Sequence, residues 1–174
     1  MTVLIAFATT EGQTRKIAEK IGFYACARNH EVELYDTASL TDVPMVDDFA
    51  EIIVAASIHE EHHQESAINF VAAHLDQFRR KPSALVSVSL SAAIPNEHME
   101  AQRYVDRFIS TTGWSPANIL LLAGALSLPK CDYFQRQVLK HILEKFDNNL
   151  DQDFYEFTNW SILEGFIDKF LREI

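Results

Sequence analysis

A hydroxyl-rich stretch near the start of the chain has the composition of a phosphate-binding loop. Residues 9–14 (TTEGQT) follow the apolar run 3–8 and precede a helical pattern that begins near Thr14. The first N–H groups of a helix have no partner within it, and the helix dipole adds partial positive charge there, so anions bind well. The stretch has no lysine and matches neither GxxxxGK[ST] nor GxGxxG. It therefore suits a singly phosphorylated ligand, and the alternative is an ordinary helix N-cap.

A second reactive group lies at residues 59–63 (HEEHH), which satisfy the zinc-protease pattern HExxH. That pattern needs both histidines on one face of a formed helix. Two residues separate His59 from an apolar run that is typical of a buried strand, so we expect a loop here and no metal site. His59 could instead hydrogen-bond a ligand or donate a proton, because imidazole titrates near neutrality. The alternative is a histidine that faces solvent.

The elements that must position these residues alternate between strands and helices. Apolar or alternating runs predict five strands, at residues 3–8, 31–35, 52–56, 84–90 and 119–123. Apolar residues at helical spacing predict helices at 14–29, 67–78, 99–109, 134–146 and 161–171. Residues 37–48 are predicted to form a loop or a short helix. Gly113 is placed to end the third long helix, and Thr158 or Asn159 to cap the last one.

This alternation predicts an α/β fold in which helices cover both faces of a five-stranded parallel sheet. Such sheets bind ligands beyond the carboxyl ends of their strands, at the switch in strand order. Three loops should lie there: residues 9–14, 57–63 and 89–95. In the strand order 2-1-3-4-5 the strands that precede them are neighbours. One mononucleotide could therefore contact all three loops.

The composition narrows the class of protein. With 174 residues, 48% of them hydrophobic, we expect a single domain over residues 1–174. A net charge of -10 argues against nucleic acid and against electrostatic docking on an anionic membrane. Cys26 and Cys131 are far apart and are typical of buried or free thiols in a reducing compartment. We find no signal-peptide pattern and no membrane-spanning run, so we expect a soluble, cytoplasmic protein.

Several segments carry a resemblance to a known family. Residues 6–18 (AFATTEGQTRKIA) resemble the FMN-phosphate loop and first helix of flavodoxins. The chain as a whole is similar to one branch, the flavodoxin-like, menaquinone-dependent protoporphyrinogen IX oxidases of bacterial haem synthesis. The segments that support the branch are residues 56–58 (ASI), 82–90 (PSALVSVSL), 114–116 (WSP), 123–129 (AGALSLP) and 158–160 (TNW).

The resemblance implies a flavodoxin-like three-layer sandwich and an FMN-dependent oxidoreductase. The flavin would take electrons from protoporphyrinogen IX and pass them to menaquinone. His59 is the candidate catalytic residue. The residues expected to bind FMN are Thr9, Thr10, Glu11, Gly12, Gln13, Thr14, Ser57, Ile58, His59, Ser89, Leu90, Ser91, Ala92, Ala93 and Gly124.

Aromatic residues outside these loops have structural and functional interpretations. Tyr133 and Phe134 follow the fifth predicted strand and could shape a hydrophobic substrate mouth, although Phe134 also fits the core pattern of its helix. Trp114 and Trp160 are expected to pack in the core or to anchor helices rather than to stack on the flavin.

The chain departs from the branch in its charges. The loop that usually reads Ile-Arg-Tyr-Gly-His is here IHEEH at residues 58–62, which places Glu60 and Glu61 beside the expected flavin ring. Residues 91–97 carry no positive charge where the branch is strongly basic. A basic surface suits porphyrin propionates and an anionic membrane, so the substrate and the membrane contact are open.

Two other functions remain open at this point. One is a flavodoxin-type electron carrier that docks on redox proteins and has no small-molecule substrate of its own, which the acidic charge favours. The other is a flavodoxin-like scaffold that has lost FMN. The electron donor (a porphyrinogen or another organic molecule), the acceptor (a quinone or a redox protein) and the oligomeric state are left open by the sequence.

Overall fold

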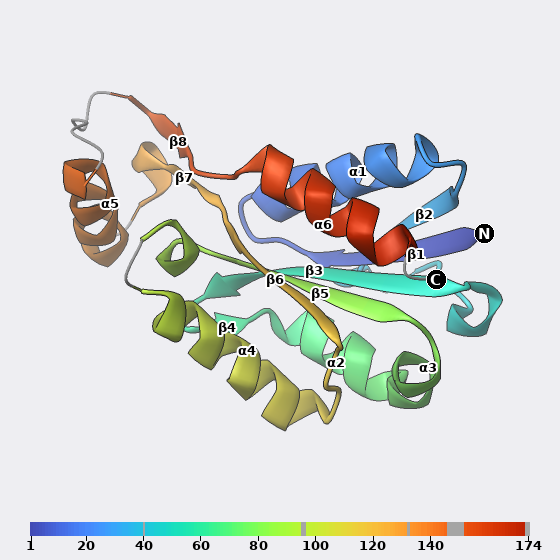
Figure 1. The fold of residues 1–174 in the computed structure, drawn as a ribbon. Coiled ribbons are helices and arrows are strands. Elements are labelled where there is room, and N and C mark those ends of the chain that lie inside the picture. The colour runs from blue at the N-terminus through green and yellow to red at the C-terminus, as the bar shows by residue number, and fades with distance from the viewer. Residues whose placement is uncertain (40, 95–96, 132, 146–151, 173–174) are drawn as a thin grey trace.

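The computed structural model describes all residues except 40, 95–96, 132, 146–151 and 173–174. A parallel five-stranded sheet forms its middle layer, in the order β2-β1-β3-β5-β6 (Figure 1). The predicted strand order 2-1-3-4-5 is confirmed, because β5 and β6 are the fourth and fifth predicted strands. Its strands are β1 (Thr2–Ala8), β2 (Glu31–Asp36), β3 (Glu51–His59), β5 (Ser83–Ser89) and β6 (Asn118–Ala123).

The register of the sheet brings the ligand loops to one edge. Ala8 at the end of β1 pairs with Ala56 of β3, and Ser57 pairs with Val88 of β5. These strands are apolar on both faces and almost entirely buried, as expected for central parallel strands. The loops that follow β1, β3 and β5 therefore open side by side at the carboxyl edge.

Helices cover both faces of the sheet (Figure 1). On one face lie α1 (Gln13–Cys26) and α6 (Trp160–Arg172), and on the other lie α2 (Glu65–Ala73), α3 (Leu75–Arg80) and α4 (His98–Thr112). Each face has its own buried core, one around Ile5, Ile17 and Ile167, the other around Leu4 and Phe108. None of the helices in the described part of the chain is both long and apolar enough to cross a membrane.

Two helix boundaries follow local signals, and one predicted helix is divided. Gly113 adopts φ 72 and ends α4, as predicted, and Oδ1 of Asn159 accepts a hydrogen bond of 3.1 Å from the N–H of Ile162 at the start of α6. The single helix predicted at residues 67–78 is instead two helices. The chain breaks at His74, whose φ and ψ are -116 and 24.

A long insertion between β6 and α6 projects beyond the carboxyl edge of the sheet (Figure 1). It contains α5 (Tyr133–Lys145), which confirms the helix predicted at residues 134–146 up to residue 145. Residue 146 lies outside the described part. It also contains β7 (Ala125–Ser127), η3 (Leu128–Lys130) and β8 (Phe154–Glu156), which the sequence did not predict. β7 and β8 pair antiparallel and join the two ends of the insertion. The remaining short elements are η1 (Val46–Asp48), β4 (His62–His63) and η2 (Ser91–Ala93).

Candidate functional site

The loop between β1 and α1 has the geometry of an anion cradle. Gly12 precedes α1 with φ 97, a left-handed conformation that favours glycine. The N–H of Gly12 donates a hydrogen bond of 2.9 Å to Oγ1 of Thr9, which tightens the loop. Thr14 is fully buried in the first turn, and its Oγ1 makes no hydrogen bond to any residue that the structure describes. Buried hydroxyls rarely lack a partner, so this one is available to a ligand.

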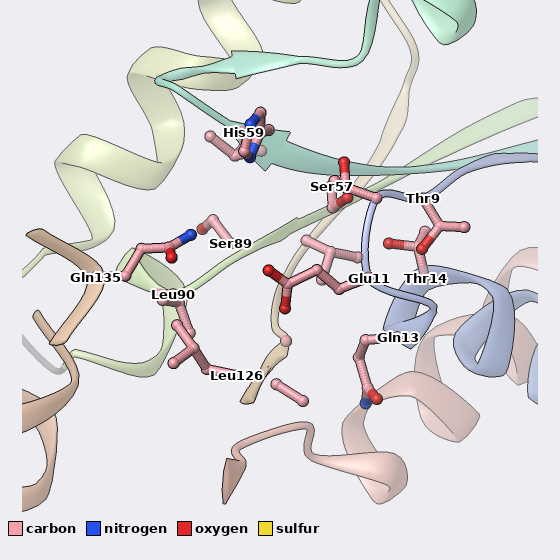
Figure 2. Close-up of a pocket in the computed structure, with 15 residues that line it drawn as sticks. Thr9, Glu11, Gln13, Thr14, Ser57, His59, Ser89, Leu90, Leu126 and Gln135 are labelled. Atoms are coloured by element: carbon pink, nitrogen blue, oxygen red, sulfur yellow. The ribbon is translucent and has the colours of Figure 1, made fainter. Parts of the chain in front are cut away.

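The carboxyl edge of the sheet surrounds a hollow in front of this loop (Figure 2). The lining residues come from the three ligand loops and from the insertion. They are Thr9, Thr10, Glu11, Gln13, Thr14, Ser57, Ile58, His59, Val88, Ser89, Leu90, Gly124, Ala125, Leu126 and Gln135.

Four residues of the expected set do not line this hollow. Gly12 shapes the loop backbone instead, and Ser91 to Ala93 form η2. Ala92 and Ala93 line a separate hollow that runs along β6. The remaining expected residues all face the hollow, including Gly124. A Cβ on Gly124 would lie 3.0 Å from Cγ1 of Val88, so the glycine allows β6 and β5 to approach closely at the site.

No local pattern pointed to four of the lining residues. Val88 fits the core pattern of its strand, and Ala125, Leu126 and Gln135 belong to the insertion, whose position over the sheet edge is a tertiary property. Gln135 reaches toward the hollow from α5 (Figure 2). Tyr133, a candidate for the substrate mouth, is 77% exposed and does not line the hollow, and the side chain of Phe134 lies outside the described part of the structure.

Gln64 is a supporting residue that sequence reasoning missed. Its Nε2 donates hydrogen bonds to Oγ1 of Thr10, at 3.2 Å, and to Oγ of Ser57. It therefore links the first ligand loop to the second. Its Oε1 is buried and makes no hydrogen bond to any described residue.

Residues 59–63 form a β-hairpin. β3 continues to His59 and pairs antiparallel with β4, with Ile58 opposite His63 and His59 opposite His62. Because HExxH binds zinc only on a helix, this geometry cannot present the motif. Among the described residues, no three His, Cys, Asp or Glu side chains are grouped so that they could hold a metal ion.

The two ends of the hairpin have opposite environments. His59 lines the hollow with a side chain that is 50% exposed. His63 is buried against Phe108, with ring centroids 4.8 Å apart, and its Nε2 lies 3.0 Å from Oγ of Ser87. Burial lowers the pKa of His63 to about 4, so this ring is neutral at pH 7.

The charge inside the hollow comes from the first loop. Glu11 extends toward the middle of the hollow (Figure 2), and it is the one carboxylate among the lining residues that the structure describes. Glu60 and Glu61, which we expected beside the ring, lie outside the lining, and the Glu60 side chain is 88% exposed. The nearby cations are paired elsewhere, because Arg15 contacts Asp36 at 2.8 Å and Lys16 contacts Glu156.

Glu156 of β8 holds the first loop to the end of the chain. It accepts hydrogen bonds from Lys16, from Nε2 of Gln13 at 3.3 Å and from Nε1 of Trp160 at 2.8 Å. Burial opposes ionisation of this carboxyl, but these bonds outweigh it and lower its pKa. Trp160 thus anchors α6, and Trp114 is buried at the other end of the sheet with Nε1 3.2 Å from Oγ of Ser83. Trp114 lies in the core and Trp160 at the start of α6, and neither is among the residues that line the hollow.

A parallel sheet with this strand order, helices on both faces and a hydroxyl-rich loop after its first strand defines the flavodoxin class of folds. Residues 4–153 match the family described as flavodoxin domain, and the chain belongs to that family. The chain is 28% identical over 171 residues to protoporphyrinogen IX dehydrogenase (quinone) of Escherichia coli strain K12, an alignment that covers 95% of this chain and 92% of the relative.

Two further proteins also align with almost the whole of this chain. The protoporphyrinogen IX dehydrogenase (quinone) of Leishmania major is 26% identical over 174 residues, which covers 96% of this chain and 73% of that protein. The crystal structure of oxidised flavodoxin 1 from Bacillus cereus superposes with a TM-score of 0.58 at 14% identity and covers 100% of this chain and 99% of its own. At that identity the likeness shows the fold alone.

Proposed function

We propose that residues 1–174 act as one FMN-binding domain and that the protein is an oxidoreductase that takes electrons from a porphyrinogen and passes them to a quinone. The observation that carries FMN binding is the unbonded, fully buried hydroxyl of Thr14, which lines the hollow at the N-terminus of α1. A phosphate is the ligand group that this hydroxyl and the free amides of the first helical turn fit best. The porphyrinogen and the quinone come from the names of the relatives.

Different residues around the hollow would bind the phosphate and the ring of FMN. Thr14 and the first amides of α1 hold the phosphate, with Gly12 allowing the backbone to turn toward it. Ser57, Ile58, Ser89 and Leu90 line the hollow on the far side of the loop and suit the ring. Gln64 fixes the distance between the two sides, because it is hydrogen-bonded to Thr10 and to Ser57.

Bound FMN would supply the electron-transfer chemistry that amino-acid side chains lack. His59 lies at the mouth of the hollow, half exposed, where its imidazole can exchange a proton between solvent and the reacting centre. Glu11 adds negative charge within the hollow. Leu126 and Gln135 of the insertion form the wall against which an organic donor could lie.

A flavodoxin-type electron carrier is the second candidate. The net charge of -10 and the absence of lysine and arginine from the described lining favour docking on a basic protein partner over binding the propionates of a porphyrin. The similarity to the two dehydrogenases over almost the whole chain favours the enzyme.

Anaerobic mixing separates the two functions. The FMN-loaded protein is mixed with protoporphyrinogen IX, with and without a soluble quinone, and flavin absorbance is followed. An oxidoreductase shows rapid bleaching by the porphyrinogen, reversal by the quinone and formation of protoporphyrin. An absorbance that porphyrinogen leaves unchanged, in a protein that still exchanges electrons with a flavodoxin reductase, would establish the carrier. A purified protein that takes up no FMN on titration would rule out both.

A further inference from the structure

The turn of the β3–β4 hairpin has a conformation that its residues disfavour. Glu60 and Glu61 both have positive φ, 48 and 65, in a two-residue connection between paired strands. Two-residue turns of this kind normally contain Asn-Gly, Asp-Gly or Gly-Gly, because a Cβ is crowded in the left-handed region. Two glutamates persist in this conformation only where their surroundings hold it in place.

Both carbonyl groups of the turn are held by side chains. Nδ1 of His62 lies 2.7 Å from the carbonyl oxygen of Glu60. Nη1 of Arg107, on α4, donates to the carbonyl oxygen of Glu61 at 2.9 Å. The same nitrogen lies 3.1 Å from Nε2 of His62. Arg107 therefore bonds one turn carbonyl directly and supports the ring that bonds the other.

The partners of His62 determine where its proton lies. A carbonyl oxygen only accepts hydrogen bonds, so Nδ1 must carry the proton. A guanidinium group only donates, so Nε2 must present its lone pair to Arg107. The contacts of Arg107 are thus to a backbone oxygen and a neutral ring, and neither depends on the exposed carboxylates of Glu60 and Glu61.

We propose that Arg107 is a positioning residue that holds the β3–β4 hairpin, and with it His59, at the edge of the hollow. His59 is the partner of His62 across the hairpin, so a displacement of the turn displaces the pocket wall. The inference deepens the proposed function, and it rests on that function only where it concerns FMN.

The hairpin can be measured without any ligand. Amide hydrogen exchange of residues 58–63 is compared in the wild type, in Arg107→Ala and in Arg103→Ala. Arg103 is the matched control, because it lies on the same helix and contacts Glu100 rather than the hairpin. We expect Arg107→Ala to accelerate exchange in the hairpin by about 3–10-fold, the effect of one charged hydrogen bond reduced by exposure to solvent. Arg103→Ala should leave it unchanged.

A second background separates positioning from simple packing. The double substitution Glu60→Asn with Glu61→Gly supplies a sequence that favours this turn without help. In that background Arg107→Ala should change hairpin exchange by less than about 2-fold, since the turn no longer needs to be held. An equal effect of Arg107→Ala in both backgrounds would show that the arginine only packs, and would overturn the proposal.

Nitrogen NMR of the histidine rings gives an independent signature. At pH 8 His62 should show a protonated Nδ1 and a bare Nε2, and Arg107→Ala should mix the two neutral tautomers. A wild-type ring protonated at Nε2, or hairpin exchange that Arg107→Ala leaves unchanged, would contradict the proposal.

The FMN titration tests the functional part. Arg107→Ala should weaken FMN binding by about 3–10-fold, and the Asn-Gly background should restore it. Faster hairpin exchange with unchanged FMN affinity would overturn the positioning role. If the wild type binds no FMN, the proposed function fails, whereas exchange and NMR still decide whether Arg107 holds the hairpin.

Discussion

Gly124 lies so close to Val88 that a Cβ on the glycine would come within 3.0 Å of Cγ1 of the valine. The contact joins the end of β6 to β5 in the wall of the hollow, and real Cβ atoms are rarely this crowded. We predict that Gly124→Ala lowers the free energy of unfolding by about 1–3 kcal/mol, the cost of overpacking. Urea denaturation measures it.

Two variants control this prediction. Gly165 lies in α6, and a Cβ added there would meet no described atom within 4 Å, so Gly165→Ala should raise stability by up to about 1 kcal/mol. Combining Gly124→Ala with Val88→Ala should cost less than the sum of the two single changes. Additive costs would mean that the two residues do not interact.

Thr14→Val should have opposite effects on stability and on binding. The hydroxyl is buried and unbonded in the described structure, so its removal should leave the unfolding free energy of the FMN-free protein unchanged or raised. If the hydroxyl bonds the phosphate, FMN affinity should fall by about 10–100-fold. Thr2→Val, at the opposite end of β1, is the control. Unchanged FMN affinity would remove Thr14 from the site.

Glu11→Gln should raise the midpoint potential of bound flavin. A carboxylate in the hollow disfavours the gain of negative charge on reduction, and its neutralisation should shift the potential upward, on the order of tens of millivolts. Glu60→Gln with Glu61→Gln is the matched control, because those carboxylates lie outside the lining, and it should produce no shift. A potentiometric titration with the same or a lower potential for Glu11→Gln would contradict the assignment.

His63 should make the protein less stable in mild acid. Its pKa falls from about 6.5 to about 4 on burial, so between these values the unfolded state binds a proton that the folded state does not. The contribution of His63 to the free energy of unfolding is therefore fully present above pH 6.5 and is lost as the pH falls toward 4. We expect about 2 kcal/mol less stability at pH 5 than at pH 7 from this residue alone. His63→Asn should lose that part of the pH dependence, and an unchanged profile would refute it.

The charge of the chain predicts weak attraction to anionic membranes. Each Lys or Arg near such a surface contributes about 1 kcal/mol, and a net charge of -10 opposes the approach. We expect no co-sedimentation with anionic liposomes at low salt, where screening is weakest. Co-sedimentation that disappears as salt is raised would reveal a basic patch and support a membrane-bound quinone as the acceptor.

Local signals predicted much of the fold. The apolar runs of β1, β3 and β5 are buried on both faces, so their pattern has little ambiguity, and Gly113 and Asn159 end and begin helices by local geometry. The break at His74 was missed because apolar spacing continues through it. β4, β7 and β8 have two or three residues each, too few for a period to show.

The part of the site that one loop forms was predictable from the sequence. The part that depends on contacts between distant segments was not. The hydroxyl-rich loop lies where its composition indicated. The position of Gln64 between Thr10 and Ser57, and that of Gln135 on α5, depend on packing across the sheet edge, which no local pattern encodes. Glu60 and Glu61 were expected beside the flavin ring. The hairpin turn instead directs them outward, and it was missed because it requires a backbone conformation that glutamate rarely adopts.

The contact between the first loop and the end of the chain has a consequence for biosynthesis. Nε2 of Gln13 donates a hydrogen bond of 3.0 Å to Oγ1 of Thr158, 145 residues later, and Oγ1 of Thr158 bonds the carbonyl oxygen of Ala123. The ribosome releases Gln13 well before Thr158, because 145 positions separate the two residues. A nascent chain can therefore assemble β1, α1 and β3 early, but the first loop gains this hydrogen bond only after residue 158 has emerged.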